Sequence, residues 1–162
     1  MKYVAWLLML VLLLAIVGVG YVYVTAQVVA ESTMVSFVSA GERADLVEDY
    51  RRRLENGTLH GTVFEERIEG APEDYLFLTY TVRLRNDCFI AADMVEMQVV
   101  PWDGFDILQP GDERARALQP RSRGDLSATV LSRWGTHSVR EVVITYYMWG
   151  IPFTMRVTIA GA

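Results

Sequence analysis

The chain has very little cysteine and histidine. Its 162 residues include one cysteine, Cys88, and two histidines, His60 and His137. A single cysteine excludes an intramolecular disulfide framework and a cysteine-rich zinc site. The three residues lie far apart in the sequence and lack the spacing of metal ligands. We therefore expect no metal and no other cofactor.

An excess of positive charge is also missing. The 20 acidic residues outnumber the 15 basic ones, and the formal net charge is −5. Nucleic-acid binding needs a basic footprint, so we expect no nucleic-acid partner. The charged fraction of 22% is close to that of ordinary globular proteins, which argues against a disordered or polytopic membrane chain.

No charged residue stands between Lys2 and Glu31. Within this interval residues 4–24 are almost wholly apolar, and a helix of that length spans about 30 Å, the thickness of the hydrocarbon core of a bilayer. The aromatic residues at its two ends are Tyr3, Trp6, Tyr21 and Tyr23. Because such rings prefer the membrane interfaces, the pattern predicts a single N-terminal transmembrane anchor within residues 1–26.

A cleavable signal peptide is the alternative to an anchor. The residues ending at Ala26 and at Ala30 resemble cleavage sites with small side chains. Cleavage would make the rest of the chain a secreted protein, whereas retention predicts a single-pass protein of the cell membrane. Lys2 precedes the apolar segment and the first arginine beyond it is Arg43, so the positive-inside rule predicts an extracytoplasmic location for the rest of the chain.

Residues 27–57 are predicted to form a linker and a short amphipathic helix. The linker, or a short extended piece, covers residues 31–41, and the helix covers residues 42–55. The apolar residues of the helix fall on one stripe and are Leu46, Val47, Tyr50 and Leu54. Asn56 and Gly57 are typical of a helix C-terminus and predict its end.

From residue 58 onward, apolar and polar residues alternate with a period of two. The clearest example is the segment 75–85, in which every second residue is apolar. We expect strands within residues 59–68, 75–85, 92–100, 105–108, 125–132, 139–149 and 153–159. Short strands separated by turn signals about every 8–12 residues predict a mainly β fold, an antiparallel β-sandwich over residues 58–162.

Two short motifs lie in this part of the chain. They are Leu-x-Pro-Gly at residues 108–111 and Leu-x-Pro at residues 118–120. With the strands around them they resemble the immunoglobulin-like or fibronectin-III-like modules of bacteria. The resemblance implies an immunoglobulin-like β-sandwich, and it implies no particular activity.

Four arginines surround one predicted turn: Arg114, Arg116, Arg121 and Arg123. Guanidinium groups recognise carboxylates and phosphates, so this cluster is a candidate site for an acidic partner or for lipid phosphates. The alternative is a solvated loop whose charge balances the acidic residues of 42–74.

The last predicted hairpin is apolar on both faces. Residues 139–149 are expected to form a central strand that is buried on both sides. Alternatively, Tyr147, Trp149 and Phe153 form an exposed aromatic patch that binds a partner. The helix at 42–55 is a candidate to cover that face.

No catalytic constellation is evident in the sequence. Glu65 and Glu66 are adjacent on a predicted strand and would point to opposite faces, and no nucleophile motif is present. We therefore expect a non-enzymatic, membrane-anchored extracytoplasmic module for protein–protein interaction, such as an accessory part of an envelope complex. The alternatives are a secreted ligand-binding or enzymatic domain, and a structural spacer.

Overall fold

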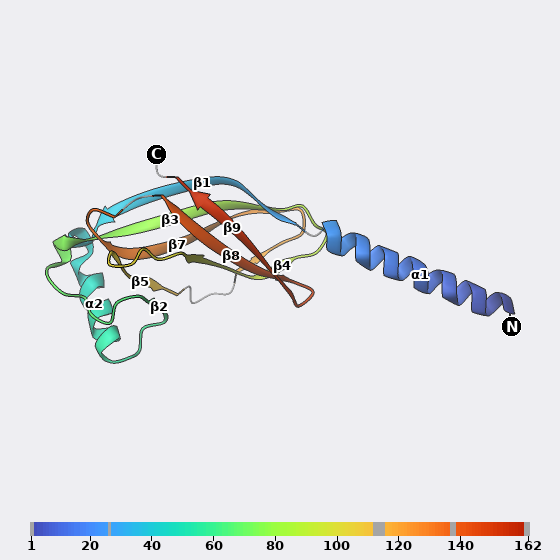
Figure 1. Cartoon of the computed structure of the whole chain (residues 1–162), viewed down its shortest axis with the longest axis horizontal. Coiled ribbons are helices and arrows are strands. Elements are labelled where there is room, and N and C mark those ends of the chain that lie inside the picture. Colours follow the sequence, from blue (N-terminus) through green and yellow to red (C-terminus); the bar gives the residue numbers. More distant parts are fainter. Residues whose placement is uncertain (1, 26, 112–115, 137–138, 161–162) are drawn as a thin grey trace.

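Two antiparallel sheets, a short helix at one end and a projecting helix at the other make up the described part of the fold (Figure 1). The computed structural model describes residues 2–25, 27–111, 116–136 and 139–160. One sheet has the order β1 (Val28–Ser39), β3 (Tyr75–Asn86), β7 (Arg123–Arg133), β5 (Asp106–Pro110) and β2 (Gly61–Val63). The other has the order β6 (Arg116–Leu118), β4 (Ala92–Val99), β8 (Arg140–Met148) and β9 (Ile151–Ile159). The predicted mainly β, two-sheet architecture is therefore confirmed.

The main hydrophobic core lies between the two sheets. The alternation predicted for residues 75–85 is confirmed, because every second side chain of β3 points into this core. These side chains are Leu76, Leu78, Tyr80, Val82 and Leu84. The opposite sheet contributes the inner residues of β8, which are Val142, Ile144, Tyr146 and Met148. Each fully buried aliphatic side chain of this kind contributes about 1.5–3 kcal/mol of transfer free energy.

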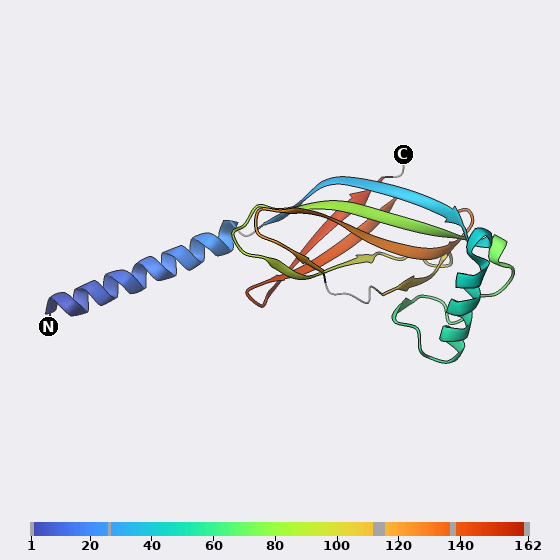
Figure 2. The ribbon, with the colours of Figure 1, turned by 180° about the vertical axis from the view of Figure 1, so that it is seen from behind.

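The predicted amphipathic helix is α2 (Ala44–Glu55), which follows the short 3₁₀ helix η1 (Ala40–Arg43). It ends as predicted, with Gly57 in a left-handed conformation at φ 63°. α2 lies at the end of the sandwich opposite α1, near the 3₁₀ helix η2 (Pro72–Asp74) (Figure 2). Its Val47 packs with Phe77 and Leu131 of the five-stranded sheet in a second, smaller core. The helix therefore does not cover the last hairpin, contrary to the suggestion above.

Of the two alternatives for residues 31–41, the linker is wrong and the extended piece agrees with the structure. Residues 31–39 belong to β1, which pairs with β3 from Val28 opposite Asn86 to Ser39 opposite Leu76, and residues 40 and 41 begin η1. The sandwich therefore begins well before residue 58. The sequence does not distinguish a strand from a linker here, because β1 is an edge strand with little alternation in burial: even Phe37, in register with an inward residue of β3, is 68% exposed.

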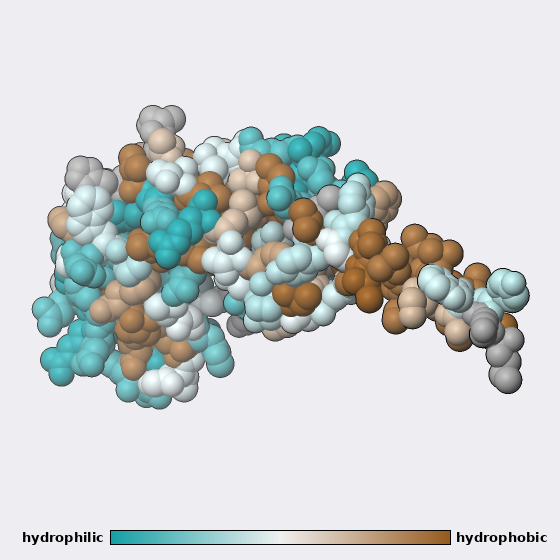
Figure 3. All heavy atoms as spheres, turned by 45° about the vertical axis from the view of Figure 1, so that its right-hand side comes forward, coloured by the Kyte–Doolittle hydropathy of each residue, from teal (hydrophilic) through white to brown (hydrophobic). Residues whose placement is uncertain are grey.

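α1 (Lys2–Thr25) projects from one end of the sandwich and presents an almost continuous apolar surface (Figure 3). Residues 3–24 are long and apolar enough to cross a membrane, although a signal sequence has the same properties. Only residues 26 and 27 separate α1 from β1. Val22 packs against the main core, and the ring of Tyr23 lies 5.8 Å from that of Phe153.

Candidate functional site

The end of the sandwich next to α1 gathers three connections from distant parts of the sequence (Figures 1 and 2). They are the β3–β4 loop (87–91), the β6–β7 turn (119–122) and the β8–β9 turn (149–150). Antiparallel pairing brings them together, because the start of β1 lies opposite the end of β3, and the start of β4 lies opposite the end of β8. We call these three connections the rim.

The buried side chain of Asn86 holds two parts of the rim together. Its Nδ2 atom donates hydrogen bonds to the carbonyl oxygens of Ile90 at 2.7 Å, Leu118 at 3.1 Å and Gln119 at 3.2 Å. Its Oδ1 atom accepts a hydrogen bond from the Cys88 N–H at 2.9 Å. A buried amide that satisfies four backbone groups fixes the loop and the turn in one geometry, since leaving these groups unpaired is costly.

The rim exposes a cation and an aromatic ring in contact. The turn is closed by a hydrogen bond from the Ser122 N–H to the Gln119 carbonyl at 3.3 Å, and Arg121 at its third position has φ 55°. Glycine or asparagine usually occupies such a position, so arginine there costs about 1 kcal/mol. The Arg121 guanidinium carbon lies 4.2 Å from the centroid of the Phe89 ring, which is 77% exposed. The backbone N–H of Arg121 also donates to the Cys88 carbonyl at 3.2 Å.

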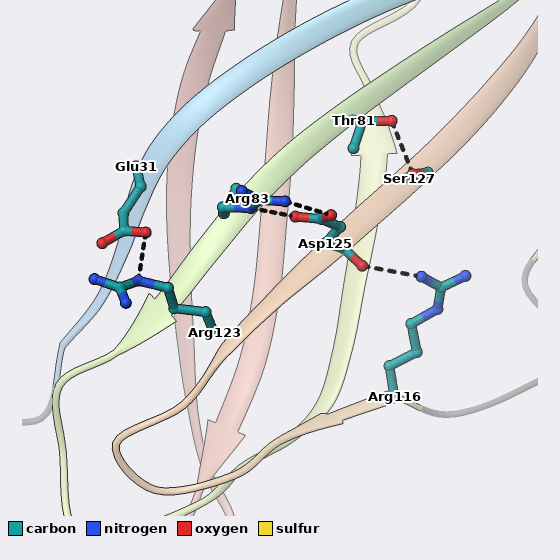
Figure 4. Close-up of polar contacts among 7 residues, drawn as sticks. All are labelled: Glu31, Thr81, Arg83, Arg116, Arg123, Asp125 and Ser127. Atoms are coloured by element: carbon teal, nitrogen blue, oxygen red, sulfur yellow. Dashed lines mark hydrogen bonds and ion pairs between the residues drawn. The ribbon is translucent and has the colours of Figure 1, made fainter.

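An ion-pair network covers the outer face of the five-stranded sheet beside the rim (Figure 4). Arg83 binds Asp125 through two hydrogen bonds of 2.8 and 3.0 Å. Glu31 accepts a hydrogen bond of 2.8 Å from Arg123 and forms an ion pair of 3.2 Å with Arg85. The hydrogen bond from Arg123 lowers the pKa of Glu31, and the one from Arg83 lowers the pKa of Asp125.

Polarity changes along this face with distance from α1. Near the rim the face is charged, and Arg116 also donates a hydrogen bond of 3.3 Å to the Asp125 carbonyl (Figure 4). In the middle of the sheet the Thr81 and Ser127 hydroxyls share a hydrogen bond of 2.9 Å. At the far end Phe77 is covered by α2. The outer face of β3 and β7 therefore has ion pairs at both ends, with Arg83–Asp125 and Arg123–Glu31 next to α1 and Arg133–Glu65 at the far end.

The predicted aromatic patch does not form on one face. Phe153 points inward, where its ring stacks on that of Tyr146 with centroids 5.5 Å apart. Tyr147 is half-buried on the opposite face of the sheet, and Trp149, at the hairpin turn, is 61% exposed. The register of β9 against β8 explains the error, because it pairs Phe153 with Tyr146 and so turns it toward the core.

The prediction that β8 is buried on both faces is also wrong. Its inner side chains are buried, whereas Val143, Thr145 and Tyr147 on the outer face are only partly covered. β8 is a central strand, but no further layer of the described structure lies over its outer face. Apolar residues with moderate exposure are therefore compatible with a two-layer sandwich.

The structure gathers three of the four predicted arginines and one of the predicted aromatic residues at the same end of the sandwich. Arg121 belongs to the rim, Arg116 and Arg123 flank it, and Trp149 forms the hairpin tip. Arg114 lies outside the described residues. The residues that sequence reasoning missed are Glu31, Arg83, Arg85, Asn86 and Phe89. Phe89 gave the only usable signal, because it is a large apolar residue in a predicted loop.

A groove of about 520 Å³ opens along the side of the sandwich between the two sheets. Among its described lining residues, Glu96 is the single carboxylate and Arg116 the single cation. General acid–base catalysis by two carboxylates has no basis in that lining. The described residues also contain no group of three or more His, Cys, Asp or Glu placed to hold a metal ion, and His137 lies outside them.

No protein-family model matches the chain, and no curated protein matches it significantly. Among solved structures, the cupredoxin domain of amoB from Nitrosocaldus yellowstonii is similar over 83% of this chain and 87% of that domain. The sequence identity is 14% and the TM-score is 0.33. So low a likeness implies nothing about metal binding by this chain. The fold therefore defines a β-sandwich protein with an N-terminal apolar helix.

Proposed function

We propose that the chain is a membrane-anchored, extracytoplasmic module of immunoglobulin-like type that binds a neighbouring protein and performs no catalysis. The length and exposed apolar surface of α1 support the anchor. The single carboxylate in the lining of the groove gives the enzymatic alternative no support.

Contacts at the start of β1 favour retention of α1 over cleavage after Ala30. That cleavage would remove the first three residues of the strand. Val28 is buried, and its N–H donates a hydrogen bond of 3.4 Å to the Tyr146 hydroxyl. Glu31 would become the N-terminal residue, and its new α-amino group would place a positive charge beside Arg85 and Arg123, the ion-pair partners of its side chain. Cleavage after Ala26 would leave β1 whole and is distinguished by mass.

The observation that carries the proposal is the edge of β1. An unpaired strand edge is a template for another strand, and proteins protect such edges with short length, charge, proline or bulges. Of the four edge strands, β2 and β6 have only three residues each, and β9 carries Pro152 and Arg156. β1 is protected near α1 by a bulge between Ala30 and Ser32, but residues 33–39 contain neither charge nor proline.

The unprotected part of β1 also exposes apolar side chains, namely Met34, Phe37 and Val38. We therefore assign this edge to an extended segment of a neighbouring membrane protein that adds to the sheet as a further strand. Backbone hydrogen bonds would supply affinity, and the exposed side chains would supply specificity. Because α1 leads directly into β1, the docking edge stands at a fixed position relative to the bilayer.

Site-specific photo-crosslinking in intact membranes tests this proposal. A benzoyl-phenylalanine residue at position 37 should give one defined adduct with another protein. Met34→Lys should abolish that adduct, because it introduces charge at the docking edge. Val63→Lys, on the short edge strand β2, is the matched control and should leave the adduct unchanged.

Two outcomes would contradict the proposal. The first is a crosslinking yield from the probe at position 37 that is no higher than the yield from the same probe at position 63. That result would favour a structural spacer. The second is an adduct that contains only this chain, at twice its 18.3 kDa, which would make a second copy the occupant of the edge.

A further inference from the structure

We propose that the rim rests on the bilayer and binds anionic lipid headgroups, with Arg121 contacting phosphate and with Phe89 and Trp149 lying in the interfacial layer. This inference rests on the proposed anchoring by α1. It concerns the opposite end of the sandwich from the unprotected part of β1, so the two surfaces can be tested separately.

The position of the rim relative to α1 is the first argument. Only two residues join α1 to β1, and a connection of that length spans no more than about 10 Å. The Asp87 N–H of the rim donates a hydrogen bond of 3.4 Å to the Gln27 carbonyl within this connection. If α1 crosses the bilayer, its terminal Tyr21 and Tyr23 lie at headgroup level. The rim then lies at the same level.

Charge is the second argument. Among the residues that the structure describes, five arginines lie in or beside the rim, against four carboxylates, in a chain whose net charge is −5. The arginines are Arg83, Arg85, Arg116, Arg121 and Arg123, and the carboxylates are Glu31, Asp87, Asp93 and Asp125. This end therefore has one more arginine than carboxylates among its described residues, whereas the whole chain is acidic, and that local balance suits an anionic membrane surface.

Arg121 is the residue best placed to bind phosphate. The other four arginines, which lie beside the rim, bond to carboxylates or carbonyl groups of the sheets. The side chain of Arg121 is exposed, and among the described residues it contacts the Phe89 ring and forms no ion pair. Its guanidinium fork matches the geometry of a phosphate group. The left-handed turn that holds it in this position is strained, as backbone at binding sites often is.

Exposed aromatic rings beside the arginines are the third argument. Phe89 and Trp149 come from different connections and are both largely exposed at the end from which α1 leaves. Aromatic side chains next to arginines are typical of membrane interfaces, where the ring meets the acyl boundary and the cation meets phosphate. An acidic protein or free phosphate would use the same guanidinium group, but the proximity of α1 favours the lipid.

The test uses the full chain in nanodiscs, with a nitroxide at Trp149→Cys on a Cys88→Ala background. One set of discs contains phosphatidylcholine alone, and the other contains about one third phosphatidylglycerol. The measurement is relaxation of the label by oxygen, which enters the bilayer, against relaxation by a water-soluble nickel complex. Val63→Cys places the control label on β2, away from the rim.

We expect the ratio of oxygen to nickel accessibility at position 149 to rise about five-fold in the anionic discs, with no change at position 63. Arg121→Glu should reverse this rise. Arg52→Glu, which changes an exposed arginine of α2 at the far end, should not.

The proposal is overturned if the label at position 149 is equally water-exposed in both bilayers, or if Arg121→Glu has no effect. If millimolar inorganic phosphate in phosphatidylcholine discs shields the label at position 149 from the nickel complex, the site binds a soluble anion instead. If only added acidic protein shields the label, the site binds a protein partner. Both results overturn the lipid assignment. Failure of α1 to anchor is recognised separately, because the chain would not enter the discs.

Discussion

Burial of the Tyr80 hydroxyl predicts a loss of stability above pH 10 that a single substitution should remove. The side chain is 0% exposed in the main core, and no described residue forms a hydrogen bond with its hydroxyl. Burial raises its pKa from 10.0 to about 12, although the nearby guanidinium of Arg140 acts in the opposite direction. Arg140 is itself paired with Asp106 at 3.1 Å, which weakens that opposing effect.

The sign and size of the effect follow from this shift. In the unfolded chain Tyr80 loses its proton near pH 10, whereas in the folded chain it keeps the proton until about pH 12. The contribution to stability is therefore fully present below pH 10 and is lost as the pH rises toward 12. A rise of the pKa from 10.0 to about 12 corresponds to a loss of about 3 kcal/mol once the pH exceeds both values, and of about 1 kcal/mol at pH 11.

Urea unfolding of the detergent-solubilised chain and of Tyr80→Phe measures this loss. At pH 8 we expect the variant to equal the parent chain or to exceed it by about 1 kcal/mol, because the removed hydroxyl has no partner among the described residues. At pH 11 the variant should lead by about 1 kcal/mol more. Tyr147→Phe, on the outer face of β8, controls for removal of a hydroxyl. Parallel curves for the parent chain and Tyr80→Phe from pH 8 to pH 11 would refute the reasoning.

Three further predictions concern packing and charge. Asn86→Leu leaves up to four backbone groups of the rim unpaired and should lower the unfolding free energy by about 3 kcal/mol, as measured in urea, whereas a change below 0.5 kcal/mol would argue against its role. Leu131→Ala, in the second core under α2, should cost about 3 kcal/mol and increase amide exchange in that helix before the rest of the sandwich. Asp125 has a pKa lowered by the hydrogen bond from Arg83, so the stability that its carboxylate contributes is present above its unfolded pKa and is lost as the pH falls through its folded pKa. Arg83→Gln should therefore raise the pKa of Asp125, as measured by NMR titration. An unchanged pKa would contradict the pairing.

The sequence predicts strands well where one face is buried and the other is not. β3 and β8 have that pattern, and buried and less buried side chains alternate along β8 and along most of β3 in the structure. β1 does not, because an edge strand with an exposed inner side has little alternation to detect. Its place in the sheet is determined by pairing with β3, a long-range interaction that local patterns do not contain.

The candidate site likewise contains residues that the sequence groups locally and residues that only long-range pairing brings together. The predicted arginines Arg116, Arg121 and Arg123 are close in the sequence and could be grouped by inspection, whereas Arg83 and Arg85 reach this end only through the pairing of β3 with its neighbours. Asn86 and Phe89 join them only through pairings across the sandwich, in which Asn86 bonds to Leu118 and Gln119 more than 30 residues away. Phe153 was misplaced because its face depends on the register of the hairpin, which a shift of one residue reverses.

Carbonate fractionation of expressing cells, followed by the intact mass of the chain and protease access from outside, tests the central claim most directly. A retained anchor predicts the full 18.3 kDa chain in the membrane pellet, with residues 31–162 reached from the outer side. A soluble species whose mass begins after Ala26 or Ala30 would contradict the anchored module, and with it the proposed contact of the rim with the bilayer.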